Sequence, residues 1–317
     1  MTVKRLESLV DILRRFNVFF IFIGLCVLLS VLSDRFLNLS NLLTVALQTS
    51  IVAITAVGMT FTMLTAGIDL SVGSIVALSS ALSAGFIIKQ GMPTYLAMAL
   101  ALAVGAGLGA ISGLLIVKGR LPPFVSTLAM MAVGRGLTLA YTRGWTIPIM
   151  IEEFTFWGSG TIGPVPVPVV VLAVVFVVAY IVLSRTRFGL HVYAIGGHQE
   201  TARLAGINVD RVTTAAYVIS GFTAALAGII TAARLWSAQP NVAAGLELDA
   251  IAASVLGGTS LFGGVGSVGG TIVGAFIMGV LNNGLNLLEV SSYYQKVIKG
   301  IVFIMAVLLD LYTKGRK

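Results

Sequence analysis

Long apolar runs recur along the whole chain, and a more polar interval separates most of these runs from the next. A helical run of about 20 residues crosses the ~30 Å hydrocarbon layer of a bilayer. The pattern predicts about ten such helices, at residues 17–33, 42–65, 72–89, 94–117, 122–142, 166–184, 212–235, 248–262, 268–288 and 294–311. Because backbone in lipid must satisfy its own hydrogen bonds, we expect an all-α, polytopic membrane protein.

The third and eighth of these segments are weaker than the rest, because they are short and rich in small residues. One centres on the motif Thr65–Ser74 and the other on the motif Glu247–Thr259, and each motif joins one or two acids to a run of small residues. A glycine-spaced helix comes after each: Gly105, Gly107, Gly109 and Gly113 in one half, and Gly269, Gly270, Gly274 and Gly279 in the other. The match predicts two related halves with interrupted helices, a usual mark of a translocation path. Close packing of helices is the alternative explanation of the glycines.

The longest polar interval of the second half, residues 185–212, carries four arginines and both histidines. An interval of this length between two apolar runs must lie in water. Its centre predicts a short helix ended by a glycine, and its small residues favour docking onto another protein. That segment consists of Glu200, Thr201, Ala202, Arg203, Leu204, Ala205 and Gly206. Glu200 and Arg203, three residues apart, can pair with each other or with the partner. A solvated charged loop is the alternative.

Polar residues inside apolar segments are costly and therefore point to function. We expect six of them to line a translocation path: Asp69, Ser71, Asp249, Asn282, Asn283 and Asn286. For the two acids the alternative is capping of the helix that follows each break. For the three amides the alternative is hydrogen bonding between helices. Arg135 adds a charge to the fifth segment.

Composition agrees with a membrane protein, since 57% of the 317 residues are hydrophobic, 10% are charged, and the mean hydropathy is +1.02. We expect one transmembrane domain over residues 1–317. An amphipathic lead-in (Leu6, Leu9, Val10 and Leu13) precedes its first membrane-spanning helix. Most of the 20 basic residues fall in alternate polar intervals and at the two ends, which predicts cytoplasmic N- and C-termini. The net charge of +8 therefore reflects topology and not nucleic-acid binding.

The chain lacks the motifs of an enzyme. The glycine run Gly263–Ser267 has no lysine, so it is not a phosphate-binding loop. No His, Cys and Asp cluster has metal-ligand spacing, and the two histidines lie seven residues apart in one interval. We therefore expect no cofactor, and energy from an ion gradient or from a separate subunit.

Several long stretches carry a family resemblance, and they occur in order along nearly the whole chain. They are Ala56–Thr60, Gly67–Ser74, Gly196–His198, Ala202–Val209, Ser237–Pro240, Glu247–Ala253, Leu256–Leu261 and Asn282–Leu288. In these stretches the chain resembles the permease subunits of ribose-type carbohydrate importers of the bacterial ABC transporter superfamily.

The resemblance implies a multi-pass subunit of the bacterial inner membrane, in contact with lipid and paired with a second permease copy. It also implies ABC ATPase subunits below the permease and a periplasmic sugar-binding protein above it, with ribose as the leading substrate. The family's ATPase-docking pattern, Glu-Ala-Ala-x-x-x-Gly, fits Glu200–Gly206, with Thr201 in place of the first alanine. Two alternatives remain: an ion-coupled secondary transporter that uses Asp69, Asp249 or Glu247, and a scaffold that transports nothing.

Overall fold

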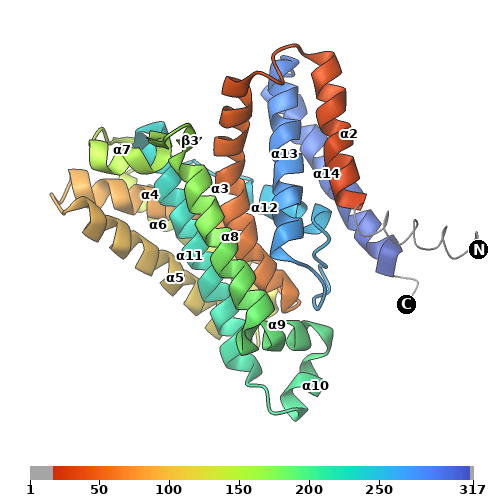
Figure 1. Ribbon diagram of the computed structural model, residues 1–317. Helices are drawn as coiled ribbons and strands as arrows, with labels where there is room; N and C mark the ends of the chain where they lie inside the picture. The colour runs from red at the N-terminus through yellow and green to blue at the C-terminus, as the bar shows by residue number, and fades with distance from the viewer. Residues whose placement is uncertain (1–16, 315–317) are drawn as a thin grey trace, which may run out of the picture.

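The computed structural model describes residues 17–314 of the chain, and this part is almost entirely helical (Figure 1). The amphipathic lead-in expected at Leu6–Leu13 lies outside the described residues. The helices are α2 (Asn17–Leu32), α3 (Leu39–Leu64), α4 (Val72–Ile88), α5 (Thr94–Val117), α6 (Pro123–Thr142), α7 (Glu152–Ser159), α8 (Val167–Arg185), α9 (Arg187–Gly197), α10 (Gln199–Leu204), α11 (Val209–Leu235), α12 (Leu246–Leu256), α13 (Val268–Leu287) and α14 (Ser292–Lys314). Two antiparallel pairs of two-residue strands join β1 (Ile147–Pro148) to β4 (Ser237–Ala238) and β2 (Thr161–Ile162) to β3 (Val165–Pro166).

Every predicted segment coincides with a helix, but the helices differ in length. Among the described residues, six are long and apolar enough to cross a membrane: α3, α5, α6, α8, α11 and α13. The predicted membrane-spanning, all-helical class is therefore confirmed, while the number ten stays a prediction. The eighth segment was predicted to run to residue 262, but α12 ends at Leu256 because Gly257 and Gly258 follow, the latter at φ +88°. Eleven residues make a helix of roughly 16 Å, about half the hydrocarbon layer.

Helix α11 is the centre of the molecule, since it packs against α3, α4, α5 and α7. Glycines allow this close packing. A Cβ at Gly109 would meet the Tyr217 backbone, and a Cβ at Gly221 would meet the Gly105 carbonyl. The packing explanation of the glycine spacing therefore holds here, although Gly107 and Gly269 have nothing within 4 Å of an added Cβ. The relation between two halves stays a prediction.

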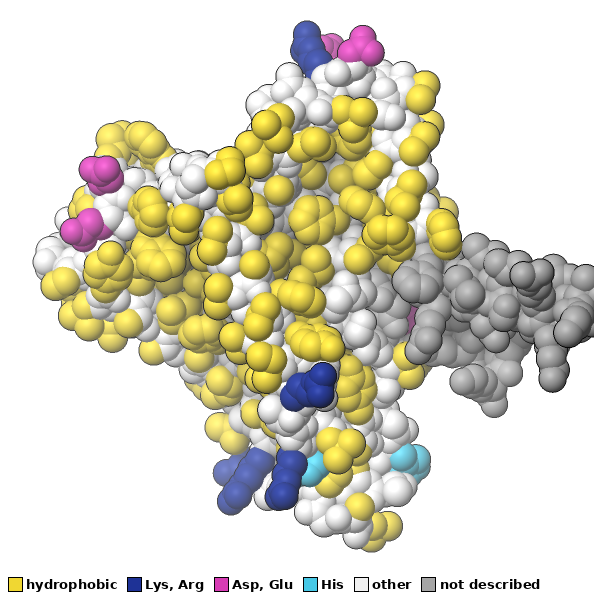
Figure 2. Space-filling model, viewed as in Figure 1, with side chains coloured by type: hydrophobic (Ala, Val, Ile, Leu, Met, Phe, Trp, Pro, Cys, Tyr) yellow, Lys and Arg dark blue, Asp and Glu magenta, His cyan; other side chains and the backbone are white. Residues whose placement is uncertain are grey.

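The helices fall into two groups with α3, α8 and α11 between them. In Figure 1, α2, α13 and α14 stand on one side, α4, α5 and α6 stand on the other, and α9 and α10 project from one end. Apolar side chains cover the middle of the face seen in Figure 2. Most of the Lys and Arg side chains on that face gather at the α8–α10 end, and Asp and Glu lie toward the opposite end, where a basic side chain is also present. This apolar band between charged ends fits a protein embedded in a bilayer.

Short α12 leaves non-helical backbone inside the protein. Helix α11 has 27 residues and is roughly 40 Å long, and it carries the chain away from the α10 end. From β4 the chain runs back toward the α10 end and reaches Gly264, which lies beside α9. Only the 11 residues of α12 are helical along this return. Segments 239–245 and 257–263 supply the remaining length. The Arg135 guanidinium donates hydrogen bonds to the carbonyls of Pro240 and Val242 at 2.9 and 3.1 Å. Arg135 thus satisfies carbonyls that no helix satisfies.

Candidate functional site

The polar interval folds into two short helices, α9 and α10, at one end of the molecule. His198 ends α9 and begins α10, where its Nδ1 accepts the Thr201 amide at 3.2 Å. At the other end of α10, the amides of Gly206 and Ile207 donate to the carbonyls of Arg203 and Ala202 at 3.0 and 3.1 Å. These two bonds, with Gly206 at φ +84°, form a Schellman motif. The predicted short helix ended by Gly206 is confirmed.

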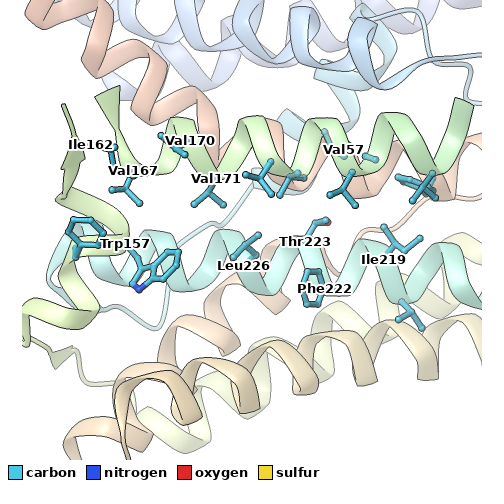
Figure 3. Close-up of a pocket in the computed structure, with 18 residues that line it drawn as sticks. Val57, Trp157, Ile162, Val167, Val170, Val171, Ile219, Phe222, Thr223 and Leu226 are labelled. Carbon is cyan, nitrogen blue, oxygen red and sulfur yellow. The ribbon is translucent and has the colours of Figure 1, made fainter. Parts of the chain in front are cut away.

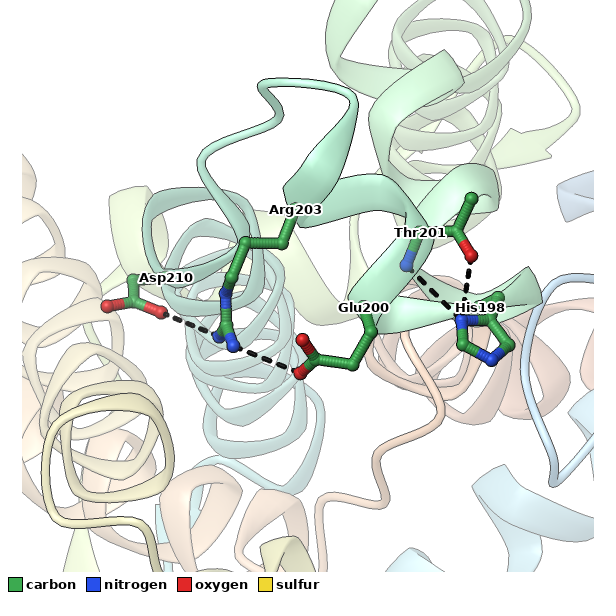
Figure 4. A network of polar contacts seen from close by, with 5 residues as sticks. All are labelled: His198, Glu200, Thr201, Arg203 and Asp210. Atoms are coloured by element: carbon green, nitrogen blue, oxygen red, sulfur yellow. Dashed lines mark hydrogen bonds and ion pairs between the residues drawn. The ribbon is translucent and has the colours of Figure 1, made fainter.

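Most side chains of α10 face solvent (Figure 4). Ala202 is buried against α9, whereas Leu204 is 88% exposed. Arg203 lies 3.0 Å from Glu200 and 3.9 Å from Asp210, and all three side chains are more than half exposed. Of the two options for the charges, the isolated chain therefore pairs Glu200 with Arg203. An exposed pair of this kind contributes only about 0–1 kcal/mol to stability, so the chain does not need these residues to fold.

Helix α9, in contrast, packs tightly against the core. Val192 and Ile195 are buried in a cluster with Phe61 and Leu64 of α3. The Tyr193 hydroxyl donates to the Gly266 carbonyl at 2.9 Å, and a Cβ at Gly196 would collide with the Leu64 carbonyl and the Gly264 amide. Burial raises the pKa of Tyr193 above its ordinary value, which agrees with a neutral hydroxyl that donates this hydrogen bond. Sequence reasoning missed this interface, because nothing local marks a glycine as close to another loop.

Asp69 and Ser71 lie together at the start of α4 and are both fully buried. The Asp69 carboxylate accepts the Ser71 amide at 3.0 Å, the Ser71 hydroxyl at 2.5 Å and the Ser220 hydroxyl of α11 at 2.7 Å. Asp69 thus holds the turn before α4 by bonding Ser71, which is the N-cap residue of that helix, and it is not itself the cap. Both side chains are buried within this chain, and their place along a translocation path stays a prediction. Ser220 was not among the expected site residues, since a lone serine on an apolar helix carries no signal.

Asp249 lies in different surroundings. Helix α12 begins at Leu246, four residues earlier than a cap at Asp249 requires, so the capping alternative is wrong for this acid. The Asp249 carboxylate instead pairs with Lys299 of α14 at 3.0 Å, and their side chains are 17% and 29% exposed. The pair borders a cavity of about 430 Å³ between α12, α13 and α14, which Lys296 also lines. Lys299 was not singled out from the sequence because it lies 50 residues away.

The three amides of α13 have three different environments. Asn283 is 8% exposed and forms a reciprocal amide pair with Asn41 of α3, at 2.8 and 3.0 Å. Asn286 is exposed and accepts the Gln295 amide at 2.8 Å. Among the described residues, Asn282 has a buried Oδ1 with no hydrogen-bond partner. Interhelical bonding therefore accounts for Asn283 and also gives Asn286 a partner on α14, and contact of Asn282 and Asn286 with a solute stays a prediction.

Two larger cavities differ in chemistry. A groove of about 670 Å³ between α8 and α11 has almost wholly apolar walls, with Trp157 toward one end (Figure 3). A hydroxylated solute would lose its hydrogen bonds with water there, so the groove suits lipid better than sugar. The second cavity, about 690 Å³, lies at the α10 end and is polar. It is bordered by Arg120, Arg203, Asp210 and the α3–α4 connection.

The long apolar helices, the apolar band and the small solvent-facing helix together define a polytopic membrane permease. The family model described as "Branched-chain amino acid transport system / permease component" matches residues 41–307, and the chain belongs to this family.

Curated relatives resemble almost the whole chain. The ribose import permease protein RbsC of Escherichia coli K12 is 48% identical over 290 residues, which cover 90% of each chain. The RbsC protein of Bacillus subtilis 168 is 49% identical over 294 residues, 91% of each chain. The D-allose transport system permease protein AlsC of Escherichia coli K12 is 38% identical over 298 residues, 93% of this chain and 91% of AlsC. No solved structure matches the chain.

These relatives confirm the resemblance to carbohydrate importer permeases. A permease component moves its solute without changing it chemically, so the chain is not an enzyme. ATP hydrolysis in such transport systems is carried out by a separate ATPase subunit.

Proposed function

We propose that this chain is the membrane permease of an ATP-driven importer for ribose or a similar pentose. The observation that carries the substrate is the 48–49% identity to ribose import permeases, against 38% to the D-allose permease, over similar lengths. The family description mentions branched-chain amino acids, but these sugar permeases match nine-tenths of the chain. A periplasmic binding protein would deliver the sugar, and cycles of ATP binding and hydrolysis would open the path outward and then inward.

Residues Glu200–Gly206 would form the docking site for the ATPase. Helix α10 supports this role because it projects from the molecule and exposes Leu204, which makes little contact within this chain. An exposed leucine beside Ala205 can enter a cleft on a partner, and the charges of Glu200 and Arg203 can exchange their mutual pair for pairs across the interface. Basic side chains gather at the end of the molecule that carries α10 in Figure 2, and this end would face the cytoplasm of a bacterial inner membrane. Both termini of the chain would also lie on the cytoplasmic side.

A second copy of the permease would cover the face formed by α12 and α14. Asp249, Lys296 and Lys299 border a cavity on that face, and charges at membrane depth need protein or water beside them rather than lipid. Two copies in contact there would enclose a polar passage, lined by Asp249, Asn282 and Asn286. Asp69, Ser71 and Asn283 would shape its walls from behind, through their hydrogen bonds with neighbouring helices.

The test is uptake of radiolabelled ribose by proteoliposomes that hold the permease with its cognate ATPase and binding protein. We expect uptake that requires internal ATP and that excess unlabelled ribose suppresses more strongly than D-allose does. Uptake driven by a proton or sodium gradient without ATP would contradict the proposal and support a secondary transporter. Stronger suppression by D-allose would overturn the assigned substrate while leaving the ATP-driven class intact.

The docking role has its own matched variants at Gly206. Gly206→Val introduces a β-branched residue at φ +84°, where such residues are strained, whereas Gly206→Asn tolerates this left-handed conformation. We expect the valine variant to lose ATPase binding and uptake while it still pairs with a second permease copy, and the asparagine variant to keep both. ATPase binding by the valine variant at the level of the unchanged chain would contradict the docking role.

A further inference from the structure

The glycine run Gly263–Ser267, which is not a phosphate-binding loop, forms the connection between α12 and α13. It lies against the end of α3, where the Gly264 amide donates to the Leu64 carbonyl at 3.0 Å. Leu64 is the last residue of α3, and its carbonyl has no partner within the helix. This hydrogen bond therefore joins the two places where the chain is interrupted, the α3–α4 connection and the α12–α13 connection.

Helix α9 touches both sides of this junction. Tyr193 is hydrogen-bonded to the Gly266 carbonyl, on the α12–α13 side. Gly196 lies against both the Leu64 carbonyl and the Gly264 amide, so closely that no Cβ fits. The neighbouring Gly197 has nothing within 4 Å of an added Cβ. Contact with the junction is thus specific to one face of α9.

Helices α9 and α10 are linked directly, because His198 is the C-cap of one and the N-cap of the other. Its amide donates to Ala194 of α9 at 3.2 Å, while its ring accepts the Thr201 amide of α10. Ala202 of α10 is also buried in the hydrophobic cluster that contains Val192 and Ile195 of α9. These contacts connect the two helices directly, so we expect a displacement of α10 to displace α9 as well.

We propose that α9 moves both interrupted segments together, through Tyr193 and Gly196, when a partner displaces α10. This inference rests on the proposed function, in which the partner is the ATPase. The α3–α4 connection carries the buried Asp69 and the start of α4, and the α12–α13 connection carries the end of α12. One displacement at α10 thus reaches α4 and α12 at the same time. Tyr193 and Gly196 are positioning residues that need not contact the ATPase or the sugar.

The test compares Gly196→Ala with Gly197→Ala in the complete complex of permease, ATPase and binding protein. For Gly196→Ala we expect ATPase binding like that of the unchanged chain, but about tenfold less uptake per ATP hydrolysed, because the added methyl forces α9 away from the junction. For Gly197→Ala, which adds the same methyl in open space, we expect uptake per ATP like that of the unchanged chain. The ratio of uptake to hydrolysis isolates coupling, because a simple loss of folded protein lowers both rates together.

Tyr193→Phe is the second variant, and it decides the matter if Gly196→Ala does not fold. It removes only the hydroxyl that bonds Gly266, and we expect about threefold less uptake per ATP with ATPase binding retained. The inference would be overturned if Tyr193→Phe kept the uptake per ATP of the unchanged chain. Where Gly196→Ala also folds, it would have to keep the same uptake per ATP. Failure of the unchanged permease to bind any ATPase would instead overturn the proposed function.

Discussion

Asp69 and Asp249 accompany the two short helices, α4 and α12, and the sequence around them has the same small-residue texture. Their surroundings differ nonetheless. Asp69 is fully buried and is bound by neutral donors from Ser71 and Ser220. Asp249 remains 17% exposed beside a cavity and is paired with the cation of Lys299. The two helices also touch near their starts, where a Cβ at Gly73 would lie 2.7 Å from the Ala243 carbonyl oxygen.

This difference shows that the role of an acid in a membrane protein depends on the helix that packs against it. Helix α11 gives Asp69 a hydroxyl, so the carboxylate is fixed in place as part of the start of α4. Helix α14 gives Asp249 an ammonium group and leaves one side open to a cavity. The first acid therefore contributes to the fold, and the second is available to a passage or to a partner.

Asp69→Ala should have the largest effect on stability. The Ser71 amide and the Ser220 hydroxyl would lose their acceptor in a buried site, which costs about 2–3 kcal/mol in the free energy of unfolding. Asp69→Asn keeps an acceptor oxygen and is the matched control with a smaller loss. The measurement is thermal unfolding of the detergent-solubilised permease. A melting temperature equal to that of the unchanged chain in Asp69→Ala would remove the structural role of this acid.

Asp249→Ala should have an intermediate effect, about 1–2 kcal/mol, because it leaves the Lys299 ammonium half-buried without its partner. Combining it with Lys299→Met should recover most of this loss. The double-mutant cycle then gives a coupling energy of about 1 kcal/mol or more between the two residues. Strictly additive losses in the cycle would mean that the ion pair does not contribute to stability, and the contrast with Asp69 would rest on exposure alone.

The Asn41–Asn283 pair should give the smallest of the three effects, about 1 kcal/mol for Asn283→Ala, because neutral amide hydrogen bonds contribute modestly. Asn41→Ala added to that variant should cost little more, since the pair is already broken. Asn286→Ala, at an exposed position on the same helix, removes one amide hydrogen bond from Gln295 and serves as the comparison, with a smaller loss expected. An equal loss in Asn286→Ala would show that the method detects helix propensity and not the amide pair.

Sequence reasoning located the helices well, because lipid-length apolar runs and glycine ends are local signals. It correctly predicted a helix over Glu200–Leu204 ended by Gly206, since the left-handed glycine follows directly from local sequence. It placed the end of the eighth segment six residues too late, because it followed the apolar residues Leu261 and Phe262 past Gly257 and Gly258, where α12 ends. Hydrophobicity alone does not distinguish a helix from an apolar turn.

The partners of the site residues could not be predicted, because they come from distant parts of the chain. Ser220 lies 151 residues after Asp69, and Asn283 lies 242 residues after Asn41. The contact of Gly196 with Leu64 and Gly264 is a property of three packed segments, and no single segment carries a sign of it. Such pairings follow from the packing of α3, α11 and α13.

The short α12 also has a consequence for the order in which the chain is built into the membrane. Its flanking backbone depends on groups from both directions along the chain: Arg135, synthesised some 105 residues before Pro240, and Asp310, which accepts the Leu261 amide and is synthesised 49 residues after it. During translation Arg135 has therefore already been synthesised when segment 239–245 leaves the ribosome. Asp310 has not yet been synthesised when Leu261 does so. The Leu261 amide therefore gains this acceptor after α14 has been inserted, so the hydrogen bonding of residues 257–263 is completed by α14.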